Sequence, residues 1–172
     1  MPEWLWKAMT TLLPHVKDWF AREPKPRPVI TVAVTNDKAL IDIENVRGAG
    51  TFTAEILMAS NVEEWPDKTV WARWDHDKNA KSVQIPSKTS AKVRIAKKLR
   101  RDGEHLKWMC FFGTDHAMGQ TRMARSNGDD NRIAKVILRI VWAPPSRKGP
   151  VYVTVFLGGD GSIFSTQSDV KP

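Results

Sequence analysis

Cysteine and long apolar runs are scarce in this 172-residue sequence, which has one cysteine and no run of 18 apolar residues. A single cysteine excludes an intramolecular disulfide, and the missing apolar run excludes a membrane-spanning helix. Because the chain is long enough to bury a core and 41% of its residues are hydrophobic, we expect a folded domain that needs no disulfide bond, structural metal or cofactor. Cys110 lies in the apolar run 106–112, so it is expected to be a buried, inert thiol.

A secretory signal is not recognised either. Lys7 is the only early basic residue, and no small-residue cleavage site follows an apolar stretch. The single cysteine also favours a reducing compartment. We therefore expect a protein that is cytoplasmic or peripheral to the membrane.

Acidic residues are absent from one segment, residues 78–101, which holds nine of the 27 basic residues. The rest of the chain has 18 basic and 19 acidic residues, so this segment accounts for the formal net charge of +8. A concentrated positive charge attracts phosphate or anionic lipid, although it also occurs on faces that are merely solvated. The predicted anion-binding residues are Lys88, Lys92, Arg94, Lys97, Lys98, Arg100 and Arg101.

Residues 1–22 show the period of an amphipathic helix, with Pro14 on its polar side. Such a helix would pack on its own domain or on a second copy, or it would lie in an anionic membrane surface. The alternating prolines of residues 23–28 predict an extended linker. The residues expected to contact a partner or membrane are Trp4, Leu5, Trp6, Met9, Leu12, Leu13, Val16 and Phe20.

From residue 29 to 167 the helical period gives way to short β-type runs separated by turn residues, which predicts a sandwich or barrel followed by a tail over 168–172. The glycines of residues 158–161 indicate a hairpin, because no helix that could bind phosphate follows them. Residues 90–99 fit a strand better than a helix that Ser90 would cap. The expected strands are 29–34, 39–44, 51–58, 69–74, 106–112, 133–142, 151–157 and 162–166.

Residues 41–56, with a strand, an Asn-x-x-Gly turn and a second strand, resemble immunoglobulin-like sandwiches of bacterial adhesion type. Residues 136–140 and 151–155 resemble the closing strands of that fold. The resemblance implies a mainly β, antiparallel immunoglobulin-like sandwich, here with an N-terminal amphipathic helix, and a role in interaction rather than catalysis. The sequence departs from the family because it lacks the Cys…Trp…Cys spacing, and Tyr152 lies away from a tyrosine corner.

Catalytic chemistry has few candidates in the sequence. Asp75, His76, Asp77, Asp115 and His116 are the residues that a metal-dependent enzyme would use, but three or four ligands must converge and spacing alone does not show this. No nucleophile motif is present. We therefore expect no enzyme, no metal and no cofactor.

The polar stretch 113–131 is long for a strand connection, and such loops often carry function. Its expected interaction residues are Met118, Arg122, Met123 and Arg125. The first hypothesis is thus a non-catalytic interaction module that binds a protein partner or forms a homo-oligomer. Its N-terminal helix would dock it to a membrane surface or to a second subunit. The alternative is a nucleic-acid-binding protein that uses residues 78–101 with Trp71 or Trp74 as a stacking platform.

Overall fold

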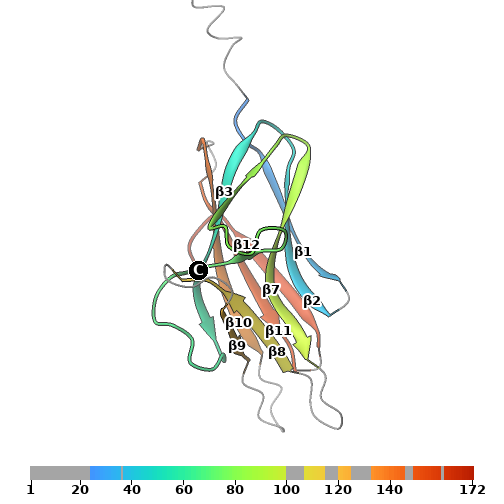
Figure 1. Cartoon of the computed structure of the whole chain (residues 1–172), viewed down its shortest axis with the longest axis vertical. Helices are drawn as coiled ribbons and strands as arrows, with labels where there is room; N and C mark the ends of the chain where they lie inside the picture. The colour runs from blue at the N-terminus through green and yellow to red at the C-terminus, as the bar shows by residue number, and fades with distance from the viewer. Residues whose placement is uncertain are drawn as a thin grey trace, which may run out of the picture.

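Twelve strands in two antiparallel sheets make up the described part of the chain (Figure 1). The computed structural model describes residues 24–35, 37–99, 107–114, 120–124, 133–145, 149–159 and 161–172. Over these residues the all-β, two-sheet fold agrees with the predicted sandwich architecture.

The predicted fold class needs a correction, because the described residues contain strands and no helix. The predicted helix over residues 1–22, with its contact residues from Trp4 to Phe20, lies outside the described residues. Periodic apolar residues are a condition for a helix but do not by themselves stabilise one. Over the residues that the structure describes, the fold is therefore mainly β, with two antiparallel sheets and no helix.

Sheet A has the order β1-β2-β7-β8-β9, with β5 paired to β7. Its strands are β1 (Pro28–Thr35), β2 (Lys38–Asn45), β5 (Arg73–Trp74), β7 (Thr89–Leu99), β8 (Lys107–Phe112) and β9 (Gln120–Met123). The strand over Thr89–Leu99 confirms the preferred reading of residues 90–99, and the helical alternative is wrong.

Sheet B has the order β12-β11-β10-β3-β4, with β6 paired to β3. The hairpin predicted at residues 158–161 is confirmed, because β11 and β12 pair antiparallel and Gly161 has a φ of 87°. Its strands are β3 (Gly50–Ser60), β4 (Val70–Trp71), β6 (Ser82–Ile85), β10 (Ala134–Ala143), β11 (Val151–Leu157) and β12 (Ile163–Ser168).

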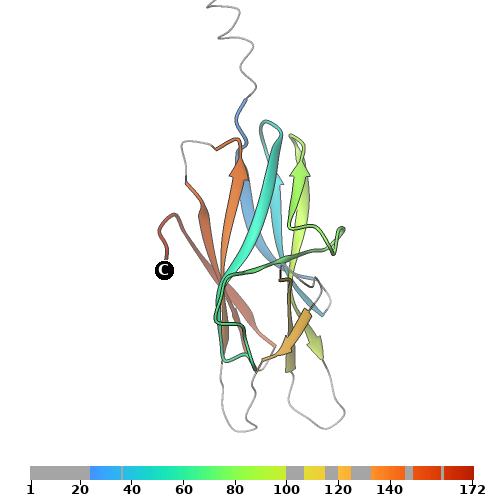
Figure 2. The same cartoon turned by 60° about the vertical axis from the view of Figure 1, so that its left-hand side comes forward.

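The core lies between the two sheets, which Figure 2 shows as facing layers. Alternate residues of each strand point inward, so Ile41, Ile43 and Val93 of sheet A meet Phe52 and Leu138 of sheet B with no exposed surface. Burying each such side chain contributes roughly 1.5–3 kcal/mol relative to leaving it in water.

The sandwich is closed by backbone hydrogen bonds along one long side. The chain passes from sheet B to sheet A through β4, Ala72 and β5. Ala72 N donates to Ala54 O of sheet B at 2.9 Å, and Trp71 exchanges two 2.8 Å bonds with Gly113, just after β8. Arg73 then pairs with Arg94 of β7.

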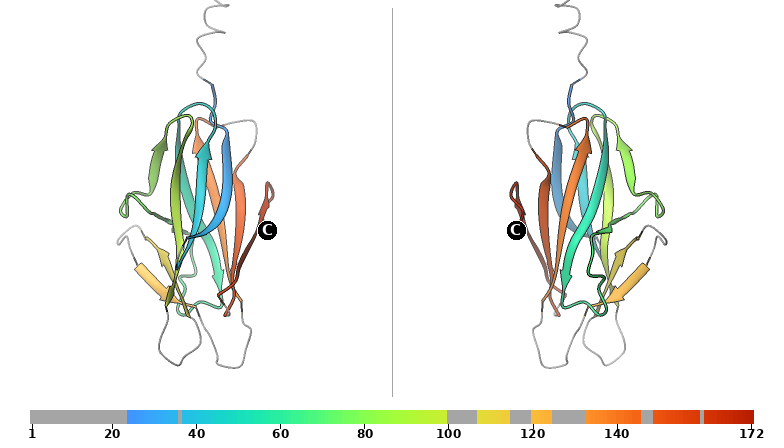
Figure 3. Two further views of the ribbon diagram at one scale, coloured as in Figure 1. Left: turned by 90° about the vertical axis from the view of Figure 1, so that its right-hand side faces the viewer. Right: turned by 90° about the vertical axis from the view of Figure 1, so that its left-hand side faces the viewer.

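The opposite long side ends in two edge strands, β1 of sheet A and β12 of sheet B (Figure 3, left). Here a side chain joins the sheets, because Gln167 Nε2 donates to Ile30 O at 2.7 Å. The sandwich is thus closed on one side by main chain and bridged on the other by a side chain.

Asn45, at the end of β2, is a fully buried polar residue that fastens three segments. Its Nδ2 donates to Gly48 O and, at 2.9 Å, to Ile85 O of sheet B, while its Oδ1 accepts from Arg27 N at 3.2 Å. The stretch before β1, expected from its prolines to be a linker, therefore packs on the domain. Gly48, with a φ of 67°, allows this packing, since a Cβ there would collide with Pro24 O.

The first prediction concerns this asparagine. Asn45→Ala removes the side-chain donor of two carbonyls and one of the two acceptors of the Arg27 N–H, so the free energy of unfolding should fall by about 2 kcal/mol or more. Urea denaturation measures this loss. The neighbouring exposed Glu44→Ala should change stability by less than about 0.5 kcal/mol, and equal effects of the two variants would contradict the role of Asn45.

The second prediction concerns Cys110, which is buried on β8. Burial raises the pKa of its thiol to about 12. Because the unfolded thiol ionises near pH 9, the stability that the folded thiol contributes is complete below pH 9 and is lost as pH rises further, by about 1.4 kcal/mol per unit. Cys110→Ala should lose less stability than the parent between pH 9 and 11 in urea denaturation. Parallel stability profiles of the two proteins would contradict the burial effect.

Candidate binding face of sheet A

The predicted anion-binding residues do not form one continuous face in the described part of the chain. Lys92 and Arg94 lie on the outer face of β7, and Lys97 pairs with Asp37 at 3.3 Å beside them. Lys88 lies in the turn before β7, where its N donates to Asn45 O. The Lys98 ammonium lies 5.2 Å from the Trp108 ring centroid, towards the inside of the sandwich. Arg100 and Arg101 lie outside the described residues.

A β-bulge explains this division. The register between β2 and β7 passes from Leu40–Arg94 to Ala39–Ala96, so Ile95 is an extra residue in β7. The bulge reverses the alternation beyond it and buries both Ile95 and Ala96. Basic residues that follow one another in sequence therefore diverge in space.

Phe111 and two arginines form the centre of the outer face of sheet A. Strand alternation turns Phe111 outward between the inward-facing Cys110 and Phe112, yet only 5% of its surface is exposed. The guanidinium carbons of Arg73 and Arg94 lie 5.4 and 5.5 Å from its ring centroid. At these distances each guanidinium group is attracted to the ring, so Phe111 and the arginines hold one another in place.

Asp75 provides a carboxylate to this cluster. Arg94 donates to Asp75 Oδ1 from Nε, at 2.9 Å, and from Nη2. Burial raises the pKa of Asp75, but the Arg94 hydrogen bonds and the charges of Arg94, Lys38 and Lys92 outweigh it, so the pKa lies below its usual value.

Positive charge exceeds negative charge around this carboxylate. Lys38, Arg73, Lys92 and Arg94 form what we term the cationic face, with Asp75 among them and Asp42 opposite Lys92 in the strand register. Burial and the nearby Arg94 charge lower the pKa of Arg73, with Asp75 acting in the opposite sense. Arg73 Nε and Asp42 Oδ1 have no hydrogen-bond partner. With the Lys97–Asp37 pair next to Lys38, five cations thus share three carboxylates.

Arg73 and Phe111 were not among the predicted site residues. The strand expected over 69–74 places Trp71 and Arg73 on one face by alternation. The strand that would pair with this segment could not be read from the sequence, so the contact of Arg73 with Arg94 could not be anticipated.

The residues considered as metal ligands do not come together in the described part of the chain. Asp75 binds Arg94, whereas His76 and Asp77 are exposed in the following turn. Asp115 and His116 lie outside the described residues. Within the described ranges, no three His, Cys, Asp or Glu side chains gather in a way that could hold a metal ion.

The predicted interaction residues of the 113–131 stretch also have different environments. Arg122 packs within the chain, because its Nε donates to Glu64 O at 3.3 Å and its guanidinium carbon lies 5.7 Å from the Phe112 ring centroid. Met123 is half-buried on β9, while Met118 and Arg125 lie outside the described residues.

The two tryptophans considered as stacking platforms differ in accessibility. Trp74 is fully buried, and its Nε1 donates to Lys81 O at 3.3 Å, so it cannot stack on an external base. Trp71 is half-buried, with the Lys81 ammonium 5.2 Å from its ring centroid.

Comparison with protein-family models, with characterised proteins and with solved structures finds no significant match to this chain. The described residues also include no helix of the length and apolarity needed to cross a membrane.

The third prediction concerns Asp75. Because its folded pKa lies below the unfolded value, the stability from its ion pair is present above about pH 4 and is lost as pH falls through the folded pKa. Asp75→Asn should reduce stability at pH 7 and should weaken its dependence on pH below 4, as measured by thermal unfolding. Asp67→Asn, at an exposed loop position, is the control, and acid sensitivity unchanged by Asp75→Asn would refute the assignment.

Proposed function

We propose that this chain is a non-catalytic interaction module that binds an acidic surface of a partner protein through the cationic face of sheet A. The observation that carries the proposal is the excess of five cations over three carboxylates, with two guanidinium groups at the Phe111 ring. Fixed guanidinium groups lose little side-chain entropy when they bind carboxylates.

Electrostatic complementarity favours a carboxylate-bearing partner over a neutral one. Lys92 is exposed on this face and reaches solvent, whereas Arg94 is held by Asp75. In the proposed complex, Lys38 and Lys92 make the first contacts with the partner. Arg73 lies beside them at the Phe111 ring and adds its positive charge to the face.

Nucleic acid is the less favoured partner. A phosphate backbone is best followed by a continuous row of cations with accessible aromatic rings. The described basic residues of the 78–98 stretch point to several places, Trp74 is buried, and Asp42 and Asp75 interrupt the cationic face.

The fourth prediction tests the cationic face with two defined polyanions, poly-L-glutamate and a 30-nucleotide single-stranded DNA. The double variant Lys38→Glu/Lys92→Glu should weaken poly-L-glutamate binding by about tenfold, because each reversal replaces an attraction by a repulsion. Fluorescence anisotropy at low salt measures both affinities.

The matched control is Lys68→Glu/Lys78→Glu, which changes the net charge equally at exposed loop positions. It should weaken binding by less than about threefold. Equal weakening by both double variants would show that only net charge matters and would reject the face. Tighter binding of DNA, with a steep loss on adding salt, would assign the face to nucleic acid instead.

A further inference from the structure

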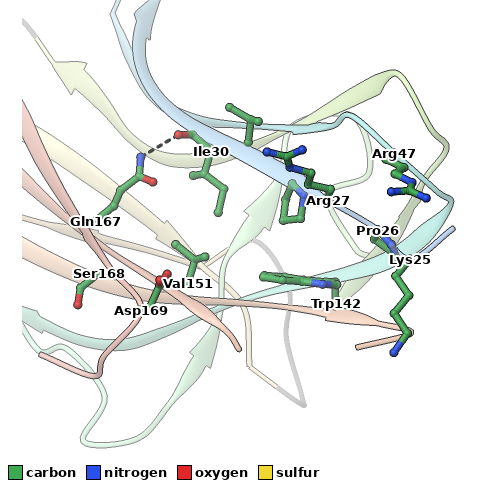
Figure 4. A pocket seen from close by; sticks show the side chains of 12 residues that line it. Lys25, Pro26, Arg27, Ile30, Arg47, Trp142, Val151, Gln167, Ser168 and Asp169 are labelled. Atoms are coloured by element: carbon green, nitrogen blue, oxygen red, sulfur yellow. Dashed lines mark hydrogen bonds between the residues drawn. The ribbon is translucent and has the colours of Figure 1, made fainter. Parts of the chain in front are cut away.

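A second site lies at the open side of the sandwich, away from the cationic face. A cavity of about 770 Å³ opens between the segment that leads into β1 and the strands β10 to β12. This volume lies within the roughly 300–1,000 Å³ range of small-molecule sites. Figure 4 shows Lys25, Arg27 and Arg47 gathered at one end, and Ser168 and Asp169 at the other.

The cationic end is held in a fixed shape by backbone contacts. Arg27 N donates to Arg47 O and Val46 N donates to Arg27 O, both at 3.0 Å, so the backbones of Arg27 and Arg47 lie side by side. Asn45 Oδ1 accepts from the same Arg27 N–H. At the other end, the bond from Gln167 to Ile30 O braces the wall. The cavity is therefore largely preformed.

Trp142 contributes a buried, unpaired donor to the wall of this cavity. This residue of β10 lines the cavity and is only 9% exposed, and its Nε1 is buried without a hydrogen-bond partner. An indole N–H is a donor only, and a buried donor without an acceptor is costly. Because this Nε1 has almost no accessible surface, a ligand in the cavity would contact the ring of Trp142 and alter the surroundings of its N–H rather than bind it directly.

The remaining wall is apolar, formed by Pro26, Ile30, Val151 and the ring of Trp142. A ligand that fits both parts has an apolar body and an anionic head. The three cations outnumber the one lining carboxylate, Asp169, which lies at the far end in Figure 4. The head would therefore lie at the cationic end.

We propose that this cavity binds a small amphiphilic carboxylate, with its head at Arg27 and Arg47 and its apolar body against the Trp142 ring, Ile30 and Val151. The site uses none of the residues of the cationic face. A negative result for the cavity would therefore leave the proposed function of the cationic face unaffected, and the reverse also holds.

The fifth prediction is tested with two probes, naphthalene-2-carboxylate and decanoate, in titrations of the full chain followed by NMR. Both should move the indole N–H resonance that is missing from Trp142→Phe, and the shift should saturate. 2-Naphthalenemethanol, which lacks the carboxylate, and acetate, which lacks the apolar body, should each bind at least about tenfold more weakly.

Variants separate the two parts of the site. Arg27→Gln/Arg47→Gln should weaken carboxylate binding by about tenfold and leave binding of the neutral analogue unchanged. Lys68→Gln/Lys78→Gln is the matched control for net charge and should retain binding. Asp169→Asn should tighten binding of both carboxylates, because it removes the one lining carboxylate.

Two outcomes overturn the proposal: equal affinity for the acid and its neutral analogue, or saturation without a shift of the Trp142 resonance. If Trp142→Phe does not fold, the arginine double variant and Asp169→Asn, both at exposed positions, still decide the question by isothermal titration calorimetry.

Discussion

The passage of one short segment from sheet B to sheet A determines much of this structure. The main chain of β4 pairs with β3, and that of β5 pairs with β7, so residues 70–74 hydrogen-bond to both layers. Buried main-chain groups must be paired, and this crossing pairs them while it closes one side of the sandwich. Alternation along the same segment buries Trp74 in the core and turns Arg73 outward. The contact of Arg73 with Phe111 therefore depends on the path of the main chain through residues 70–74.

The two long sides of the sandwich have different character as a result. The closed side is held by main-chain bonds that include Trp71, Ala72 and Gly113. On the open side, β1 and β12 each end their sheet and a glutamine joins them. Because side chains rather than main chain fill that side, there is room for the cavity beside Trp142. The cationic face and the cavity are thus two consequences of one asymmetric closure.

Much of the fold could be predicted from the sequence, but less of either site. Alternation of apolar residues located most strands, and the glycines of residues 158–161 located a hairpin. The bulge at Ile95 has no local signature, so the directions of Lys97 and Lys98 could not be derived. Pairing between strands distant in sequence is set by tertiary packing, which hid the contacts of Arg73 with Phe111. The cavity was missed because its lining comes from both ends of the chain and from the middle.

The start of β1 bears on how the protein avoids self-association. An edge strand with free N–H and C=O groups is a template on which other chains can add strands and aggregate. In β1 the first residue is Pro28, which has no N–H to offer, and the carbonyl of Ile30 already accepts from Gln167. Both features reduce the capacity of this edge to recruit another strand. Gln167, which joins the two sheets on the open side, therefore also lowers the tendency of this edge to pair with a strand of another chain.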